Sequence, residues 1–353
     1  MRSKALRNDR LDMKHANIPI FIPHLGCPNQ CVFCNQRFIS GVESFCIDTV
    51  EGDIEKALST LNESYEVEIA FFGGSFTGID RTLMISLLKI ANRYLTSGAI
   101  NGIRCSTRPD YIDTEVLSIL KEYGVTTIEL GLQSMDDRVL KLSKRGHTAA
   151  DAEKACRLIL DYGFELVGQM MIGLPGSTPE GEIKTAEKII QMGAGGARIY
   201  PTVVFRETEL AFMLECGKYK SLSLEDAISR SAAVYGVFLN FGVEVIRIGL
   251  CASENLLSDK TYLDGPNHEA LGELVKSEHF YMLIKNALSE KYVGKSIIIR
   301  VAKGYASCAI GHGRRNKKRL SYEFKLRGFK VREDDDLRGY EFEIIEEGKA
   351  VCI

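Results

Sequence analysis

The sequence predicts an α/β protein in which a parallel sheet, covered by helices, closes into a partial (β/α)6 barrel. Segments typical of strands and of helices alternate six times between residues 18 and 204. Nearly every predicted strand is apolar on both faces, which is typical of a parallel sheet buried between helices. Polar or glycine-rich motifs follow five of the strands, and parallel barrels carry their chemistry at those carboxyl ends.

The expected elements follow from apolar periodicity and from residues that begin or end helices. The expected strands are 18–24, 67–74, 102–107, 126–131, 164–173 and 197–204. The expected helices of the barrel are 48–62, 80–96, 113–123, 148–162 and 179–192, with Asp48 as the cap of the first. Beyond the barrel, we expect helices within 207–242 and 268–290 and one short strand at 243–249.

These elements divide the chain into three regions. Residues 1–17 form a polar N-terminal arm, residues 18–290 form the barrel with a helical extension, and residues 291–353 form a small basic, β-rich domain. Strands are expected in the last region because KSIIIRVAKG, YASCAIGHG, RLSYEFK and GYEFEII alternate with period two. Between residues 291 and 333, thirteen Lys and Arg residues stand against two Asp and Glu residues.

The composition is that of an ordinary globular protein, with 45% hydrophobic and 26% charged residues and a net charge of −2. The N-terminal residues MRSKALRNDRLDMKH lack the apolar core of a secretion signal, and no apolar run is long enough to span a membrane. The ten cysteines show no pattern of a secreted disulfide scaffold. We therefore expect a cytoplasmic protein without a membrane partner.

The stretch HLGCPNQCVFC, residues 24–34, holds three closely spaced cysteines, Cys27, Cys31 and Cys34. Three thiolates can bind three irons of a cubic [4Fe–4S] cluster and leave the fourth iron open to a ligand that is not protein. Phe33 places a flat apolar ring where an adenine could lie. The alternative is a zinc site, with His24 as the fourth ligand.

The spacing C-x3-C-x2-C, with an aromatic residue before the last cysteine, resembles the radical S-adenosylmethionine (SAM) superfamily. The resemblance implies that the open iron binds the amino and carboxylate groups of SAM. It also implies that an electron, from a donor of the flavodoxin or ferredoxin type, cleaves SAM to methionine and a 5′-deoxyadenosyl radical. The radical would then abstract hydrogen from a substrate above the barrel mouth. The sequence assigns no catalytic residue.

The motif GGSFT, residues 73–77, follows the second predicted strand. Gly73 and Gly74 let the backbone approach a ligand closely, and Ser75 comes next. In radical SAM proteins a glycine-rich turn at this position holds the amino group of SAM. Taken alone, the motif could also be a tight turn between a strand and a helix.

Two arginines are candidates for the SAM carboxylate, because a guanidinium can hold a carboxylate by two parallel hydrogen bonds. Arg145 in KRGHT is the preferred candidate, and Arg108 in STRPD is the second. The alternative for each arginine is a salt bridge on the surface.

Four side chains near the ends of two strands are candidates for the nucleoside part of SAM. Gln133 and Ser134 end the segment ELGLQS and could bind the ribose hydroxyls. Gln169 and Ile172, near the end of the next strand, could serve the ribose and the adenine respectively. Ser134 could instead cap the following helix.

Other residues with possible chemistry have plain structural alternatives. His147 and His268 could carry protons, and Tyr200 could face the substrate, but each could equally be a packed or bonded structural residue. Met170 and Met171 are expected to line the barrel. Three further cysteines lack the tight spacing of a second cluster: Cys251, Cys308 and Cys352.

Between about Ile18 and Tyr281, several motifs resemble the radical SAM domain of the Elongator catalytic subunit: STRPDYI, IELGLQS, KRGHT, GFELVGQMMIGLPG and IYPTVVFRETEL. That protein starts carboxymethylation of the wobble uridine of tRNA, with acetyl-coenzyme A as carbon source. Its cysteine triplet has a longer first gap, and we find no counterpart here of its acetyltransferase domain. The resemblance therefore extends to the radical chemistry and not to the acyl donor.

The basic strip GHGRRNKKR, residues 311–319, could bind the phosphates of RNA, with Tyr305, Tyr322 and Phe324 nearby to stack on bases. It could also be a solvated face, and the acidic run EDDD at 333–336 could neutralise part of it. We favour RNA, especially tRNA, as substrate. The alternatives are a small molecule of tetrapyrrole or cofactor metabolism, and a non-catalytic protein that binds the cluster or SAM.

Overall fold

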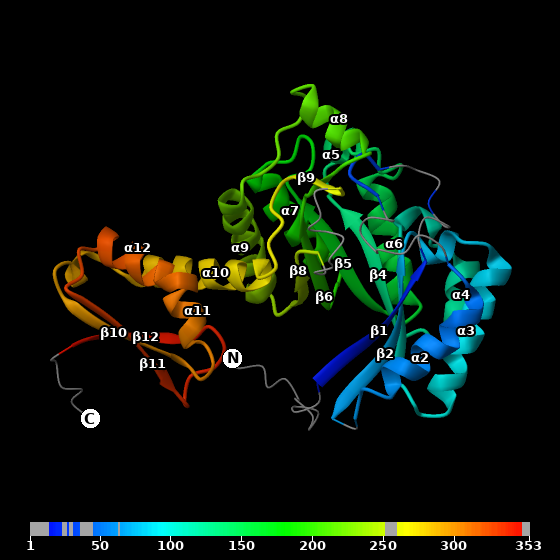
Figure 1. Cartoon of the computed structure of the whole chain (residues 1–353), viewed down its shortest axis with the longest axis horizontal. Coiled ribbons are helices and arrows are strands. Elements are labelled where there is room, and N and C mark those ends of the chain that lie inside the picture. Colours follow the sequence, from blue (N-terminus) through cyan, green and yellow to red (C-terminus); the bar gives the residue numbers. More distant parts are fainter. Residues whose placement is uncertain are drawn as a thin grey trace.

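A computed structural model of the chain describes residues 14–22, 27, 31–35, 45–62, 64–250 and 260–347. Its main feature is a seven-stranded parallel sheet with the order β1-β2-β3-β4-β5-β6-β8, curved into a partial barrel with helices on its outer face (Figure 1). The strands are β1 (Lys14–Ile22), β2 (Tyr65–Gly73), β3 (Gly102–Thr107), β4 (Thr127–Gln133), β5 (Glu165–Ile172), β6 (Gly196–Pro201) and β8 (Glu244–Ile248). The predicted α/β barrel fold is confirmed.

Two boundaries of the sheet differ from the prediction. The first strand begins at Lys14, within the region expected to be an arm, because Lys14–Ile22 pairs along its whole length with β2. The strand expected beyond the barrel is β8, and it pairs in parallel with β6 as the seventh strand of the same sheet. The inner face of the barrel is therefore wider than six strand–helix units would make it.

Helices follow the strands in the expected order. They are α2 (Val50–Leu58), α3 (Arg81–Thr96), α4 (Thr114–Glu122), α6 (Ala149–Asp161), α7 (Pro179–Gln191), α9 (Leu224–Asn240) and α10 (Leu271–Ala287). Two short helices, α5 (Asp137–Leu142) and α8 (Glu209–Glu215), were not expected as separate elements. Among the described residues, no helix combines the length and apolar character needed to cross a bilayer.

Side-chain caps fix where most of these helices begin. Asp80, Asp113 and Thr148 each accept a hydrogen bond from a backbone N–H of the first turn of α3, α4 and α6, respectively. Such a cap is worth about 1 kcal/mol. The predicted cap of the first helix is wrong, because Asp48 lies inside a short 3-10 turn and Thr49, which precedes α2, forms no side-chain hydrogen bond that caps the helix.

The main hydrophobic core lies between the outer face of the sheet and the helices. Alternate residues of each strand point into it, as Ile128 and Leu130 of β4 do. They meet fully buried side chains such as Leu117 of α4 and Ile159 of α6. Each large aliphatic side chain stabilises the fold by about 1.5–3 kcal/mol when buried, so this layer holds the sheet in place. The inner face of the sheet is therefore available for polar and functional side chains.

The C-terminal domain lies to one side of the barrel and is joined to it by α10 (Figure 1). Its sheet has the order β11-β10-β12. Phe280 and Ile284 of α10 share a core with Ile297 and Ile299 of the sheet. Its elements are β10 (Ser296–Ala302), α11 (Ala306–Ile310), α12 (Arg315–Glu323), β11 (Gly328–Asp334) and β12 (Phe342–Glu346).

Only part of the predicted strand content of this domain is present. KSIIIRVAKG and GYEFEII contain β10 and β12, as predicted, but YASCAIGHG and RLSYEFK form α11 and α12. The basic strip is therefore a turn followed by a helix. A strand that was not expected, β11, takes the remaining place in the sheet.

Candidate functional site

The three cysteines of the triplet follow the carboxyl end of β1. The turn through Cys31 and Cys34 is closed by a backbone hydrogen bond from the Cys34 N–H to the Cys31 carbonyl (3.0 Å). Val32, between them, is tied to the Ser143 carbonyl at 3.2 Å and to the Leu210 N–H at 2.8 Å. Two elements distant in sequence therefore hold this turn at the mouth of the barrel.

The structure bears on the choice between a cubane and a zinc ion. Among the described residues, no group of three or more His, Cys, Asp or Glu side chains converges closely enough to hold one metal ion. A cubane takes one thiolate on each of three irons, so its ligands lie farther apart than those of a single zinc ion. His24, the alternative fourth ligand, lies outside the described residues.

The glycines of GGSFT position the start of this cysteine loop. Gly73 has φ = +120°, and a Cβ there would lie 2.4 Å from the carbonyl oxygen of Ile22. The Gly74 N–H donates to the same oxygen at 3.2 Å. Ile22 is the last residue of β1, so the glycine turn holds the point from which the chain leaves for Cys27.

Ser75 links this turn to the next strand. Its Oγ accepts from the Arg108 backbone N–H at 3.1 Å and lies 3.0 Å from Oγ1 of Thr107. The pKa of the Cys27 thiol is raised, mainly by burial and also by the neighbouring Cys31, while Arg108, Arg145 and a hydrogen bond from the Ser75 backbone N–H act in the opposite direction. The surroundings of Cys27 thus contain donors suited to its thiolate form.

Both predicted arginines lie at the cysteines, and their side chains are buried. Arg145 Nη1 lies 3.3 Å, and Arg108 Nη1 3.7 Å, from the Cys31 sulfur. Only 5% of Arg145 and 4% of Arg108 is exposed. Arg108 also forms a two-pronged pair with Asp110, at 2.8 and 2.9 Å. Asp110, which directly follows Arg108-Pro109, was missed although it lies in the quoted motif STRPD.

Buried polar atoms without a hydrogen-bond partner among the described residues gather beside these arginines. They include Oε1 of Gln133 and Nε of Arg145. A Cβ on Gly131 would lie 3.0 Å from Nε2 of Gln133 and 3.3 Å from Nη2 of Arg145, so both side chains reach over this glycine. Buried donors and acceptors of this kind normally have partners. Gln133 therefore offers an unpartnered acceptor and Arg145 an unpartnered donor, which are the atom types that the predicted contacts with a ribose hydroxyl and a carboxylate require.

The structure supports only some of the remaining predicted nucleoside contacts. Ser134 Oγ accepts from the Asp136 N–H at 3.2 Å just before α5, which favours its alternative, structural reading. Gln169 faces the inner side of the sheet and donates to Glu129 at 2.9 Å. The Ile172 side chain is fully buried in the core between sheet and helices, and does not line the inner face. Only its backbone is left to contact an adenine.

Phe33 and Met171 lie in one apolar cluster with Cys31, beside the mouth. Phe33 is 9% exposed, so its ring is placed as expected for an apolar wall. Met171 belongs to the lining, as predicted, whereas Met170 is part of the main core. The role of Phe33 toward adenine stays a prediction.

A chain of buried charges that the sequence interpretation missed crosses the inner face below the mouth. Glu129 of β4 is fully buried and accepts from Arg104 of β3 at 3.1 Å and from Arg198 of β6 at 2.7 Å. Arg104 Nε also donates to Glu68 of β2 at 2.7 Å, and Glu68 contacts His15 of β1 at 2.6 Å. The sequence does contain a signal for this layer, because each of these charged residues stands at an alternate position of an otherwise apolar strand.

The two histidines considered as proton carriers differ. His147 is buried near the arginines, and burial together with Arg145 lowers its pKa to about 4. It is therefore neutral at neutral pH. His268 accepts from the Ala270 N–H at 3.0 Å just before α10, which is a structural role. Tyr200 contributes to the raised pKa of Arg198 through a hydrogen bond.

Comparison with known families identifies the class of this protein. The family model described as Radical SAM superfamily matches residues 21–189, and the one described as Radical SAM C-terminal domain matches residues 194–280. Together they match well over half of the chain, which belongs to the radical SAM superfamily. It is a radical SAM enzyme, and its cofactors are a [4Fe–4S] cluster and SAM.

The relatives include enzymes of one branch, as the motifs indicated. A tRNA uridine(34) acetyltransferase of Dehalococcoides mccartyi is 25% identical over 57% of this chain and 52% of its own length. Elongator complex protein 3 of Bos taurus is 35% identical over 42% of this chain and 27% of its own length. The chain thus spans about half or less of the length of these curated relatives.

A solved structure supports the same fold. The archaeal Elp3 of Methanocaldococcus infernus, with an N-terminal deletion, is 22% identical and superimposes with a TM-score of 0.63. The match covers 83% of this chain and 67% of that chain. The predicted resemblance to the Elongator branch is therefore confirmed for the radical SAM region.

Proposed function

We propose that this radical SAM enzyme modifies a uridine in RNA, with tRNA as the favoured substrate, in the cytoplasm. The relatives named for tRNA uridine(34) and for Elongator support this substrate. The proposal does not include an acyl donor, because the chain aligns with only part of those relatives. An electron donor of the flavodoxin or ferredoxin type would serve the reaction.

In this proposal, Cys27, Cys31 and Cys34 hold the cluster, which when bound supplies the electron that cleaves SAM. Arg145 would hold the SAM carboxylate, and Arg108, which is paired with Asp110, would support it. Both arginines direct donors toward Cys31. The amide oxygen of Gln133, which has no hydrogen-bond partner among the described residues, would accept from a ribose hydroxyl. These residues would orient the ligand above the layer of buried charges around Glu129.

The observation that carries the RNA substrate is the exposed face of α12. Arg315, Lys318 and Tyr322 recur at helical spacing and therefore lie on one side of the helix. Tyr322 is 86% exposed, far more than a large aromatic needs for packing. Cations beside an exposed aromatic ring can bind phosphates and stack on a base.

The acidic run at 333–336 does not neutralise this face. Asp334 pairs with Arg300 of β10, and Asp335 lies 3.8 Å from Lys303. Within the described part of the chain, Arg314, Lys317 and Lys318 form no ion pair, while Arg315 has one contact of 4.0 Å with Glu225 of α9. The predicted internal neutralisation is therefore wrong for this helix.

The charges on α12 also oppose the stability of the helix. Its first turn contains cations and no acidic residue, although a helix N-terminus favours negative charge. Each cation there costs about 0.3–1 kcal/mol. A sequence that keeps three of them in the first turn (Arg315, Lys317 and Lys318) is better explained by binding an anion than by folding.

Anaerobic reconstitution tests the chemistry. With iron, sulfide, SAM and a strong reductant, the chain should form 5′-deoxyadenosine, measured by mass spectrometry. A Cys27→Ala/Cys31→Ala/Cys34→Ala variant should form none. A Cys46→Ala/Cys216→Ala variant, which changes two exposed cysteines elsewhere, should behave as the wild type. If the Cys46→Ala/Cys216→Ala control forms no product while the triplet variant does, the assigned cluster ligands are rejected. If the wild type forms no product, the assignment of enzymatic activity is rejected.

RNA binding tests the substrate. Arg314→Ala/Lys317→Ala/Lys318→Ala should weaken binding of a tRNA transcript and reduce the slope of log affinity against log salt by about 2–3, or 0.9 for each lost phosphate contact. A matched control removes three cations that are already in ion pairs: Lys295, Lys303 and Lys330. If the wild type and both variants bind the tRNA transcript equally, and salt does not change the affinity, the result favours a small-molecule substrate.

A further inference from the structure

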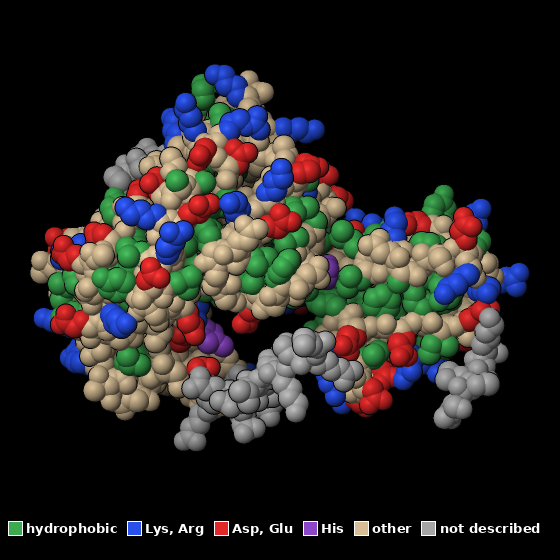
Figure 2. All heavy atoms as spheres, turned by 180° about the vertical axis from the view of Figure 1, so that it is seen from behind, with side chains coloured by type: hydrophobic (Ala, Val, Ile, Leu, Met, Phe, Trp, Pro, Cys, Tyr) green, Lys and Arg blue, Asp and Glu red, His purple; other side chains and the backbone are tan. Residues whose placement is uncertain are grey.

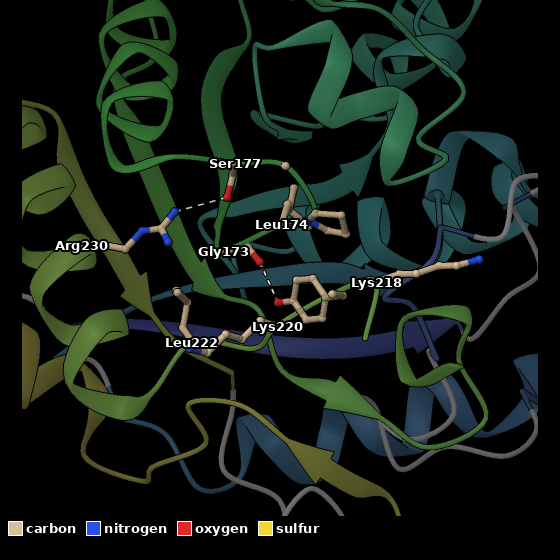
Figure 3. Close-up of a pocket in the computed structure, with 10 residues that line it drawn as sticks. Gly173, Leu174, Ser177, Lys218, Lys220, Leu222 and Arg230 are labelled. Atoms are coloured by element: carbon tan, nitrogen blue, oxygen red, sulfur yellow. Dashed lines mark hydrogen bonds between the residues drawn. The ribbon is translucent and has the colours of Figure 1, made fainter. Parts of the chain in front are cut away.

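A small cavity lies beside the barrel mouth, outside the cofactor site. It is enclosed by the loop Gly173–Ser177 after β5, by the segment Lys218–Leu222, and by Arg230 of α9 (Figure 3). Its volume is about 180 Å³. None of its lining residues belongs to the cysteine triplet or to the predicted SAM contacts.

Hydrogen bonds make the walls of this cavity rigid. The Tyr219 hydroxyl donates to the Gly173 carbonyl at 2.7 Å, and the Gly173 N–H donates to Oε1 of Glu182 at 2.7 Å (Figure 3 shows the first). Arg230 Nε donates to the same carboxylate at 2.8 Å, and Arg230 Nη2 donates to Ser177 Oγ at 3.3 Å. The cavity is therefore preformed.

The cavity carries excess positive charge. Lys218 and Lys220, on either side of the buried Tyr219, are exposed and form no ion pair in the part of the chain that the structure describes. The nearby carboxylates are already engaged. Glu182 pairs with Arg230, and Asp264 accepts from the Ser221 hydroxyl at 2.5 Å and from the Gly265 N–H at 2.8 Å.

The cavity is close to the reaction chamber. Leu174 and Tyr219, two of its wall residues, belong to the apolar cluster that contains Cys31 and Phe33. The segment that bears its lysines directly follows α8, and Figure 2 shows Lys and Arg side chains gathered on the top of the molecule, where α8 lies in Figure 1. Phe212 of α8 is 59% exposed on this same short helix.

We propose that this cavity binds a backbone phosphate of the polynucleotide substrate, next to the nucleotide that enters the barrel. The inference rests on the proposed function and adds a second contact to the one on α12. Two exposed lysines that form no ion pair among the described residues and that flank a polar cavity can supply the cations for one phosphodiester. An RNA held at α12 alone would leave the reacting nucleotide without a tether at the mouth.

The test compares Lys218→Ala/Lys220→Ala with Lys154→Ala/Lys184→Ala, which removes two exposed lysines from the outer helices α6 and α7. The probe is a short synthetic RNA stem-loop with uridines in its loop, and binding to the full chain is followed by fluorescence anisotropy at several salt concentrations. We expect the first variant to bind about tenfold more weakly, with a salt slope reduced by about 1. Formation of 5′-deoxyadenosine without RNA should be unchanged in both variants.

Each other result has a distinct meaning. If the first variant binds like the control, the cavity is not a phosphate site, although the RNA substrate stands. If the wild type binds no RNA, the proposed function and this inference both fail. If uridine 5′-monophosphate binds the wild type as tightly as the RNA does, and loses affinity in the first variant, the cavity serves a small phosphorylated ligand and the polynucleotide assignment is overturned.

Discussion

Substitution of Gly73 by alanine tests how the glycine turn positions the cysteine loop. A Cβ at this residue would lie 2.4, 2.8 and 2.9 Å from the O, C and N atoms of Ile22. All three are backbone atoms, so no side chain can rotate away to make room. The chain must either move the end of β1 or change the φ of residue 73, which is +120°.

The expected loss of stability is large but leaves a folded protein. Overpacking costs about 1–3 kcal/mol, and an unfavourable φ adds about 1–3 kcal/mol. The sum, about 2–6 kcal/mol, is a substantial part of the roughly 5–15 kcal/mol that stabilise a typical domain. Gly98→Ala is the matched control, because Gly98 has φ = +76° and a Cβ there would meet nothing within 4 Å. We expect the control to lose only about 1–2 kcal/mol.

Two measurements check the reasoning. Urea unfolding gives the difference in the free energy of unfolding between the two variants. Bound iron and sulfide after anaerobic reconstitution report on the cysteine loop, and we expect Gly73→Ala to bind much less of both than Gly98→Ala. If Gly73→Ala unfolds at the same urea concentration as the control and binds a full complement of iron, the turn does not fix the position of the loop.

Three further predictions concern buried ionisable groups. Glu129→Gln should lower the free energy of unfolding by about 3–5 kcal/mol, because it leaves the buried Arg104 and Arg198 without their carboxylate. The control Glu153→Gln, at an exposed ion pair, should change the free energy of unfolding by less than about 1 kcal/mol. Similar values for the two variants would reject the role of Glu129. Because the pKa of His147 is lowered to about 4 by burial and by Arg145, the unfolded chain binds this proton first as the pH falls. Stability should therefore decrease between pH about 6.5 and about 4, by on the order of 1–3 kcal/mol, and urea titrations should show a weaker decrease for His147→Gln; an identical pH dependence would contradict this. Arg145→Lys keeps the charge but loses the planar fork, so SAM affinity measured by anaerobic calorimetry should fall about tenfold at unchanged iron content; unchanged affinity would assign the carboxylate to another residue.

The barrel was predictable because its signals were redundant. Each strand was apolar, was followed by a helix, and ended in a motif of unusual composition, so an error in one signal was corrected by another. The position of Arg108 near the rim followed in the same way, since it comes directly after β3 and the carboxyl ends of parallel strands meet at one rim.

The face of a strand that a residue occupies was less predictable. In FELVGQMMIG both faces are apolar, so the pattern cannot decide whether Ile172 points into the barrel or toward the helices. The register with β6 decides it, and this register depends on contacts with distant residues. The Ile172 side chain points toward the helices, and the adenine contact predicted for this residue stays a prediction.

The basic strip shows a second limit. RLSYEFK satisfies a period of two, but Leu320 and Phe324 are also four residues apart and both join the core of the C-terminal domain. A short segment with both periodicities takes the structure that buries its apolar residues best. Here that structure is α12, because the helix buries Leu320 and Phe324 in the core that it shares with the sheet.

The buried charges below the mouth set a limit on the substrate. Glu68, Arg104, Glu129 and Arg198 fill the inner face across β2, β3, β4 and β6, and opening this layer would leave charges buried without partners. A substrate must therefore enter from the rim and extend only as far as the cofactors. A base inside a duplex cannot do so, because its neighbours would collide with the rim, whereas an unstacked base in a loop can enter alone. If the substrate is RNA, as proposed, a stem-loop with an unpaired uridine should react, and the same uridine paired in a duplex should not, when product is measured by mass spectrometry. Equal reaction of both would show that the layer does not limit the depth of the chamber.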